Sequence, residues 1–88
     1  MENGSSNNFN VAIGNYAMDA AMNGASNNTA VGKSSLYTNT TGACNVAIGR
    51  YSLYSNTTGT INTAVGNYAL KLNTTGNFNT AIGHGSLC

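Results

Sequence analysis

The side chains that carry most enzyme chemistry are scarce in this 88-residue chain. It has one histidine, His84, and two carboxylates, Glu2 and Asp19, which lie far apart in the sequence. General acid–base catalysis and nucleophilic triads need several such groups converging on one site. We therefore predict that the protein is not an enzyme, that it has no catalytic residues, and that His84 is an exposed structural residue.

The two cysteines, Cys44 and Cys88, are too few for a disulfide framework. With a single histidine they give no metal-ligand spacing, so neither a metal site nor a cofactor is expected. Cys44 occupies a mostly apolar repeat position that it shares with Phe9, Ile61 and Phe78, which predicts a small buried hydrophobe. Cys88 falls at a repeat position that is expected to be exposed. Two interpretations are open: Cys88 forms an intermolecular disulfide, or it marks the point where a longer array was cut.

The tyrosines are the side chains best suited to binding a partner. They fall into two repeat columns, which are Tyr16, Tyr51 and Tyr68, and Tyr37 with Tyr54. A stripe of tyrosines binds glycans or protein surfaces by stacking and hydrogen bonding, so these five form a candidate surface-binding stripe. The alternative is an aromatic ladder that only stiffens the outer wall.

The composition excludes several classes of function. Charged residues make up 6% of the chain, against roughly 25% in typical soluble domains. A formal net charge of +1 is too small to indicate a basic surface for nucleic-acid binding, so no nucleic-acid partner is expected. No run of eighteen apolar residues is present, so no membrane insertion is expected. Residues 1–4 lack the features of a secretory signal, so export by another part of a longer protein, or release by lysis, is expected.

The chain is dominated by a tandem repeat. The pentapeptide Asn-(Val/Thr)-Ala-(Val/Ile)-Gly recurs every 17 residues, with one extra residue after the first copy, and begins at Asn10, Asn28, Asn45, Asn62 and Asn79. An Asn-Thr-Thr-Gly turn separates later copies, at 39–42, 56–59 and 73–76. The period is too short for two helices, and β-branched residues favour strands. We predict an all-β parallel β-solenoid or β-roll, a single repeat domain over 1–88 with about five coils, the last incomplete.

Each repeat position then acquires a role. Period-two alternation places the second and fourth pentapeptide positions on one face of a strand. The predicted core consists of the fourth-position column and the leucines of the following block, which are Ile13, Val31, Ile48, Val65, Ile82, Leu36, Leu53 and Leu70. The opposite face carries an invariant alanine column, Ala12, Ala30, Ala47, Ala64 and Ala81. One coil buries few apolar side chains, so we expect these alanines to contact other copies in a homo-oligomer, most simply a trimer.

The pentapeptide resembles the head repeats of trimeric autotransporter adhesins, the YadA-like head. The longer unit with Asn-Thr-Thr-Gly at 56–59 and 73–76 is also similar to repeat regions of phage and giant-virus tail or surface fibre proteins. The resemblance covers roughly residues 7 to 87 and implies a left-handed β-roll packed as a homotrimer. The period departs from the pattern, because YadA-like heads usually repeat at about fourteen residues, which implies a longer outer turn here.

The expected function is that of a structural or adhesive segment of an extracellular, cell-surface or virion-surface fibre, which mediates attachment or spaces a binding tip. Two alternatives are an ice-binding β-solenoid and a subunit that assembles end to end into filaments. Against ice binding, Thr57 and Thr58 are adjacent and would point apart, and the column of Thr63 and Thr80 is interrupted by valines. Expected partners are other copies of the chain and a host-surface protein or glycan.

Overall fold

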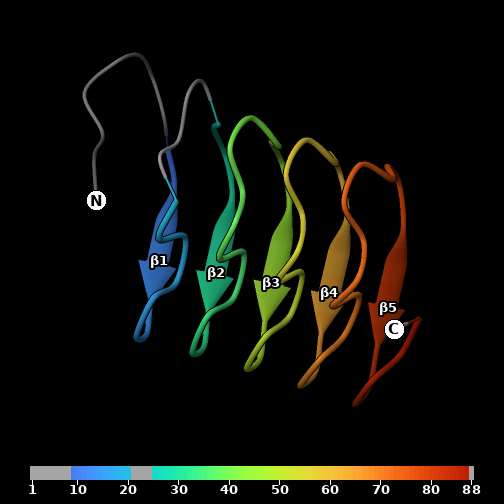
Figure 1. Cartoon of the computed structure of the whole chain (residues 1–88). Coiled ribbons are helices and arrows are strands. Elements are labelled where there is room, and N and C mark those ends of the chain that lie inside the picture. Colours follow the sequence, from blue (N-terminus) through green and yellow to red (C-terminus); the bar gives the residue numbers. More distant parts are fainter. Residues whose placement is uncertain (1–8, 21–24, 88) are drawn as a thin grey trace.

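The computed structural model describes residues 9–20 and 25–87, which form a parallel β-solenoid with coils of about 17 residues. Five short strands make one parallel sheet in chain order (Figure 1). They are β1 (Val11–Ile13), β2 (Thr29–Val31), β3 (Val46–Ile48), β4 (Thr63–Val65) and β5 (Thr80–Ile82). The predicted all-β solenoid is therefore confirmed. The extra residue of the first copy, near residues 21–24, and Cys88 lie outside the described residues.

Strand pairing joins identical repeat positions. Ala30 pairs with Ala47 and Ala47 with Ala64, so each strand is offset from its neighbour by one whole repeat. This register follows from the repeat, because a slip of one residue would move every side chain to the other face of the sheet. Like residues consequently lie in rows along the solenoid axis.

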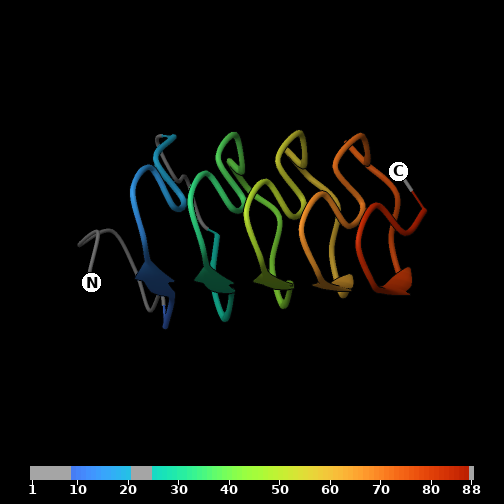
Figure 2. The ribbon, with the colours of Figure 1, turned by 90° about the horizontal axis from the view of Figure 1, so that it is seen from below.

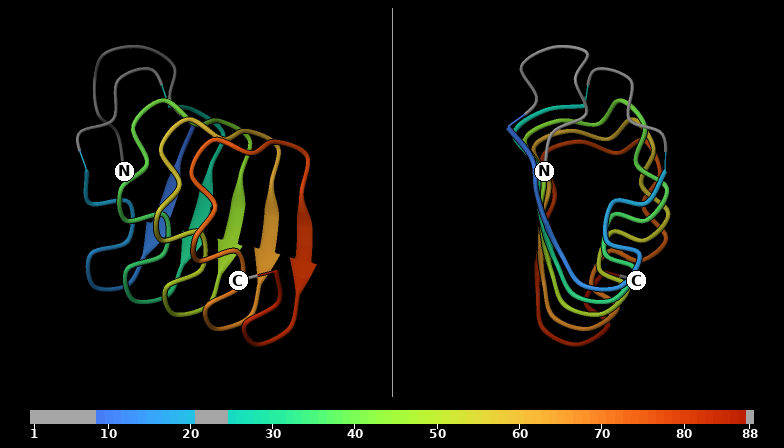
Figure 3. Two further views of the ribbon diagram at one scale, coloured as in Figure 1. Left: turned by 45° about the vertical axis from the view of Figure 1, so that its right-hand side comes forward. Right: turned by 90° about the vertical axis from the view of Figure 1, so that its left-hand side faces the viewer.

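Each coil consists of a strand, a turn, an irregular returning wall and a corner that leads into the next strand (Figure 3). Hydrogen bonds between coils continue outside the sheet. The Leu53 amide donates to the Ala69 carbonyl at 3.0 Å, and the Thr57 amide donates to the Thr74 carbonyl at 2.9 Å. The returning wall is thus held by the same kind of intercoil bonding as the sheet, although its backbone is not extended.

The interior lies between the alanine column and the leucine column. Ala30, Ala47 and Ala64 are 0% exposed, and they cluster with Leu36 and Leu53, which are also fully buried. Ala81, Leu70, Ala17, Ala69 and Met18 extend this core towards the two ends of the array, and Ala12 packs against it.

This arrangement reverses the predicted roles of the two strand faces. Ile13, Ile48 and Ile82 were expected in the core, but they are 59%, 39% and 69% exposed. Val31 and Val65, in the same column, are half-buried. The alanines predicted as oligomer contacts, Ala12, Ala30, Ala47, Ala64 and Ala81, face the interior instead. The physical reason lies in packing, because the leucines of the returning wall fill the interior and pack against the methyl groups of the facing strands in one buried cluster.

Two columns of asparagine are buried beside this core. The Asn45 side chain accepts a hydrogen bond from the backbone N–H of Asn62 at 3.0 Å. It also donates a hydrogen bond to the backbone carbonyl of Gly59, in its own coil, at 2.8 Å. Asn56 donates to the Asn39 side chain one coil away at 2.9 Å. These amides satisfy backbone groups that the narrow coil removes from water, which is the condition under which buried polar side chains are stable.

The pentapeptide glycine is required on two grounds. Gly49 has a φ of 130°, and a Cβ at this position would lie 2.6 Å from the carbonyl carbon and oxygen of Gly66. Larger residues are tolerated at other left-handed positions, including Cys44, Ile61 and Leu53. The amide of each of these residues donates to the adjacent coil at 3.0 Å, and these bonds offset the cost of the conformation.

Candidate functional site

Among the described residues, the single histidine and the one carboxylate are not brought together. His84 is exposed in the last coil, where its ring lies 5.8 Å from that of Tyr68, whereas Asp19 is exposed in the first coil. Within residues 9–20 and 25–87, no three His, Cys, Asp or Glu residues gather in a way that suits a metal ion. Over the same residues, no helix has the length and apolar character needed to cross a membrane. The described residues also form three distinct surfaces.

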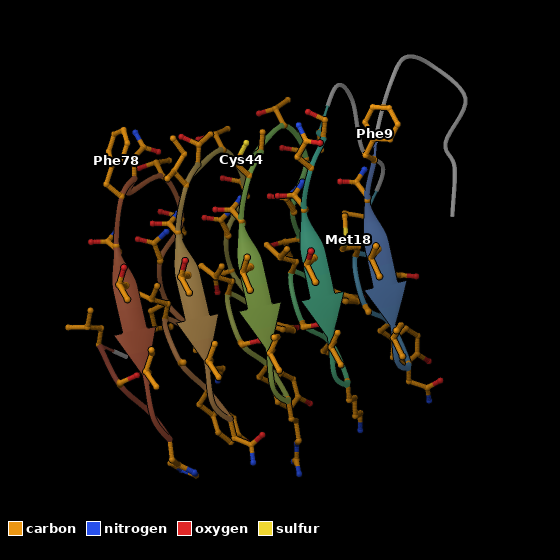
Figure 4. The ribbon with its side chains drawn as sticks, turned by 180° about the vertical axis from the view of Figure 1, so that it is seen from behind. Phe9, Met18, Cys44 and Phe78 are labelled. Atoms are coloured by element: carbon orange, nitrogen blue, oxygen red, sulfur yellow. The ribbon has the colours of Figure 1, made fainter. Side chains whose placement is uncertain are left out.

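The first such surface is the outward side of the sheet, which we call the sheet face. Every outward strand position holds a β-branched residue, and these residues are Val11, Ile13, Thr29, Val31, Val46, Ile48, Thr63, Val65, Thr80 and Ile82. The face is uncharged, and its rows repeat at the strand spacing of about 4.8 Å. Figure 4 views the molecule from this side. Chemically, such a regular face, built from valine and isoleucine with three threonines, suits contact with another ordered surface.

The second surface is a ridge along the corner that precedes the strands. In Figure 4 the labelled Phe9, Cys44 and Phe78 lie along this edge, whereas the buried Met18 lies lower, at the level of the strands. The prediction that Cys44 is buried is wrong, because its thiol is exposed. At this corner the backbone is left-handed, with a φ of 57° at Cys44 and 60° at Phe78, and the side chains of both residues are exposed on the outside of the turn. Apolar character alone did not reveal that turn.

The third surface joins the two predicted tyrosine columns, and we call it the tyrosine edge. Tyr37 and Tyr54 stack with ring centroids 5.2 Å apart and planes 4° from parallel, and Tyr51 and Tyr68 stack at 5.3 Å and 13°. An edge-on contact of 5.2 Å between Tyr51 and Tyr54 links the two stacks. Tyr16 contacts Tyr37 edge-on at 6.2 Å. All five tyrosines thus form one connected aromatic cluster.

Cations lie against these rings, and the prediction from sequence overlooked them. The Arg50 guanidinium is 5.3 Å from the ring centroid of Tyr51 and 5.8 Å from that of Tyr68. The Lys71 ammonium is 5.8 Å and 5.5 Å from the same two centroids. These distances are in the range of cation–π attraction. The sequence did contain a signal for these contacts. Arg50 directly follows a pentapeptide glycine and precedes Tyr51, and Lys71 occupies in the next repeat the position that Tyr54 has in its own.

The tyrosine edge and the sheet face occupy different parts of the coil. The residues of the edge follow the strands, in the turns and the start of the returning wall, and these segments form a row in the view from below (Figure 2). The sheet face belongs to the strands themselves. A partner can therefore cover one surface while the other stays open. No protein-family model, curated protein or solved structure matches this chain in comparisons with known proteins.

Proposed function

We propose that this chain is a structural and adhesive repeat segment of an extracellular, cell-surface or virion-surface fibre, and that it acts as a homo-oligomer. The observation that carries the proposal is the sheet face, an uncharged array of β-branched side chains on a chain that has few charges elsewhere. Large contiguous apolar patches on soluble proteins mark interaction sites. A fibre segment needs such a face to associate with its own copies, and it needs a separate surface for attachment.

Self-association through the sheet face replaces the alanine contact that the sequence had predicted. A second copy presents rows with the same spacing, so ridges of Ile48 and Val65 on one chain match grooves between rows on another. The resemblance to adhesin heads favours three copies around an axis. Association would cover Ile13, Ile48 and Ile82, the most exposed fourth-position residues of the face.

The oligomeric state tests this proposal. Light scattering coupled to size-exclusion chromatography is expected to show a trimer for the unaltered chain and a monomer for Ile48→Lys, because an unpaired ammonium cannot be buried in an apolar contact. Thr58→Lys, at an exposed position of the returning turn, is the matched control and should remain a trimer. Circular dichroism would verify that both variants keep their β structure. An unaltered chain that is monomeric at its solubility limit would overturn the proposal.

Ice binding is a second candidate, favoured by the same face. Its two outward columns are β-branched in every coil, so Val11 and Val46 preserve the methyl array of the threonine column instead of interrupting it. The two functions exclude each other, because a face covered by another copy cannot meet ice. Thermal hysteresis in a monomeric sample, lost in Ile48→Lys, would favour ice binding over the fibre segment.

A further inference from the structure

The aromatic and cationic side chains of this protein are segregated to one edge. Every tyrosine, every lysine and arginine, and the single histidine lie within five residues after a pentapeptide glycine. The solenoid stacks these segments in a row beyond the carboxyl ends of the strands (Figures 1 and 2). Asp19, in the first coil, is the one carboxylate of this row. The tyrosine edge therefore has net positive charge on a chain that is otherwise nearly uncharged.

The cations recur from coil to coil. Lys33, Arg50 and Lys71 belong to three consecutive repeats, and the Tyr51 amide donates to the Lys33 carbonyl at 2.9 Å, which places Lys33 one coil from Arg50. At a strand spacing of about 4.8 Å, the three charges follow the axis over about 10 Å. A linear partner with regularly spaced negative groups would meet them in turn.

The packing of the tyrosines limits which parts of their side chains can contact a ligand. Because Tyr37 stacks on Tyr54 and Tyr51 on Tyr68, ring faces are turned towards one another along the row. Arg50 and Lys71 lie against the second stack, and His84 lies against Tyr68. The groups left for a ligand are mainly ring edges and phenol hydroxyls, which donate and accept hydrogen bonds. Ligands that bind by stacking on free aromatic faces, such as unpaired nucleobases or neutral sugars, are therefore expected to bind weakly.

From these observations we propose that the tyrosine edge binds an acidic polysaccharide lying along the solenoid axis. Its carboxylate or sulfate groups pair with Lys33, Arg50 and Lys71, and its hydroxyl and ring oxygens accept hydrogen bonds from the tyrosine hydroxyls. The inference rests on the proposed attachment function and names the chemical class of the attached surface. Several copies in one oligomer would strengthen weak individual contacts through their effective concentration.

Fluorescence polarisation with labelled heparin oligosaccharides (sulfated) and labelled oligogalacturonate (carboxylated) tests the proposal, with maltooligosaccharide as the neutral probe. Binding of at least one acidic probe and much weaker binding of the neutral probe are expected, and the stronger acidic probe identifies the preferred anion. Binding should weaken when ionic strength rises from about 0.05 M to about 0.5 M. R50Q/K71Q should weaken binding about tenfold, the equivalent of about 1.4 kcal/mol.

A charge-balanced variant separates the site from bulk charge. Adding Thr58→Lys and Thr75→Lys to R50Q/K71Q restores the net charge at exposed positions away from the edge, and binding should stay weak. Tyr54→Phe keeps the ring stack but removes one hydroxyl, and about threefold weaker binding is expected. Circular dichroism would verify that each variant keeps the fold of the unaltered chain.

Three results would overturn the proposal: failure of both acidic probes to bind the folded chain, recovery of binding in the charge-balanced variant, or equal binding of an oligothymidylate. Light scattering on the same samples keeps the two proposals apart. A chain that forms trimers without binding acidic probes would refute the tyrosine-edge site and leave the fibre segment intact.

Discussion

Replacing Asn45 by alanine tests whether the buried asparagine column holds successive coils together. The Asn45 side chain accepts a hydrogen bond from the backbone N–H of Asn62 at 3.0 Å and donates one to the Gly59 carbonyl at 2.8 Å. Asn45 is 0% exposed. In the variant the buried Asn62 amide loses its acceptor. The Gly59 carbonyl loses one donor but keeps the Asn56 side chain at 3.1 Å.

The expected cost follows from these two groups. A buried amide without a partner costs about 1–3 kcal/mol, and the lost bond to the Gly59 carbonyl adds a net contribution of about 1 kcal/mol. The variant should therefore lose about 2–4 kcal/mol, a large part of the roughly 5–15 kcal/mol by which folded proteins are stable. Denaturant unfolding followed by circular dichroism measures the free energy of unfolding.

Asn79→Ala is the matched control from the same column. Asn79 lies in the last coil, and within the described residues its side chain makes one hydrogen bond, a 3.4 Å contact with Asn73. Its removal should cost less than about 1 kcal/mol. Equal losses for Asn45→Ala and Asn79→Ala, or a loss below about 0.5 kcal/mol for Asn45→Ala, would refute the argument that the column stabilises the solenoid through buried amides.

Three further predictions, which involve five substitutions, test other parts of the packing by the same measurement. Gly49→Ala should cost at least about 2 kcal/mol more than Gly83→Ala. Both glycines have positive φ, but of the two only Gly49 would place a Cβ against the next coil. Similar losses would show that the cost comes from the backbone conformation and not from contact with the next coil. Ala47→Leu should cost about 1–3 kcal/mol by overpacking the interior. Ile48→Thr should change the free energy of unfolding by less than about 0.5 kcal/mol, measured at a protein concentration at which light scattering shows monomers. A larger loss for Ile48→Thr than for Ala47→Leu would mean that Ile48, and not Ala47, faces the interior. Ile61→Asn should stabilise the chain by about 1 kcal/mol, because Ile61 has a left-handed φ of 55°, a conformation that asparagine adopts at lower cost, and Asn27 already occupies the equivalent corner. Destabilisation would mean that the Ile61 side chain contributes more packing than its exposure indicates.

The repeat alone was sufficient to predict the architecture. Identical positions recur at one interval, and pairing of Ala30 with Ala47 and of Ala47 with Ala64 is the arrangement that keeps every side-chain row on one face. The leucine column was also predicted from the repeat as part of the core, and Leu36 and Leu53 are fully buried. In the same way, the repeat predicted that the tyrosines would form columns.

The assignment of inside and outside required the tertiary structure. Alternation shows that Val46 and Ile48 share a face, but it does not say whether that face or the one with Ala47 points inward. Hydrophobicity favoured isoleucine, yet it is the alanine column that packs in one buried cluster with Leu53 of the returning wall. The orientation of Cys44 depended in the same way on the path of the chain at its corner, which residue type does not reveal. Local periodicity specifies which side chains lie together, whereas the thickness of the closed coil, a property of all its residues at once, decides which of them are buried.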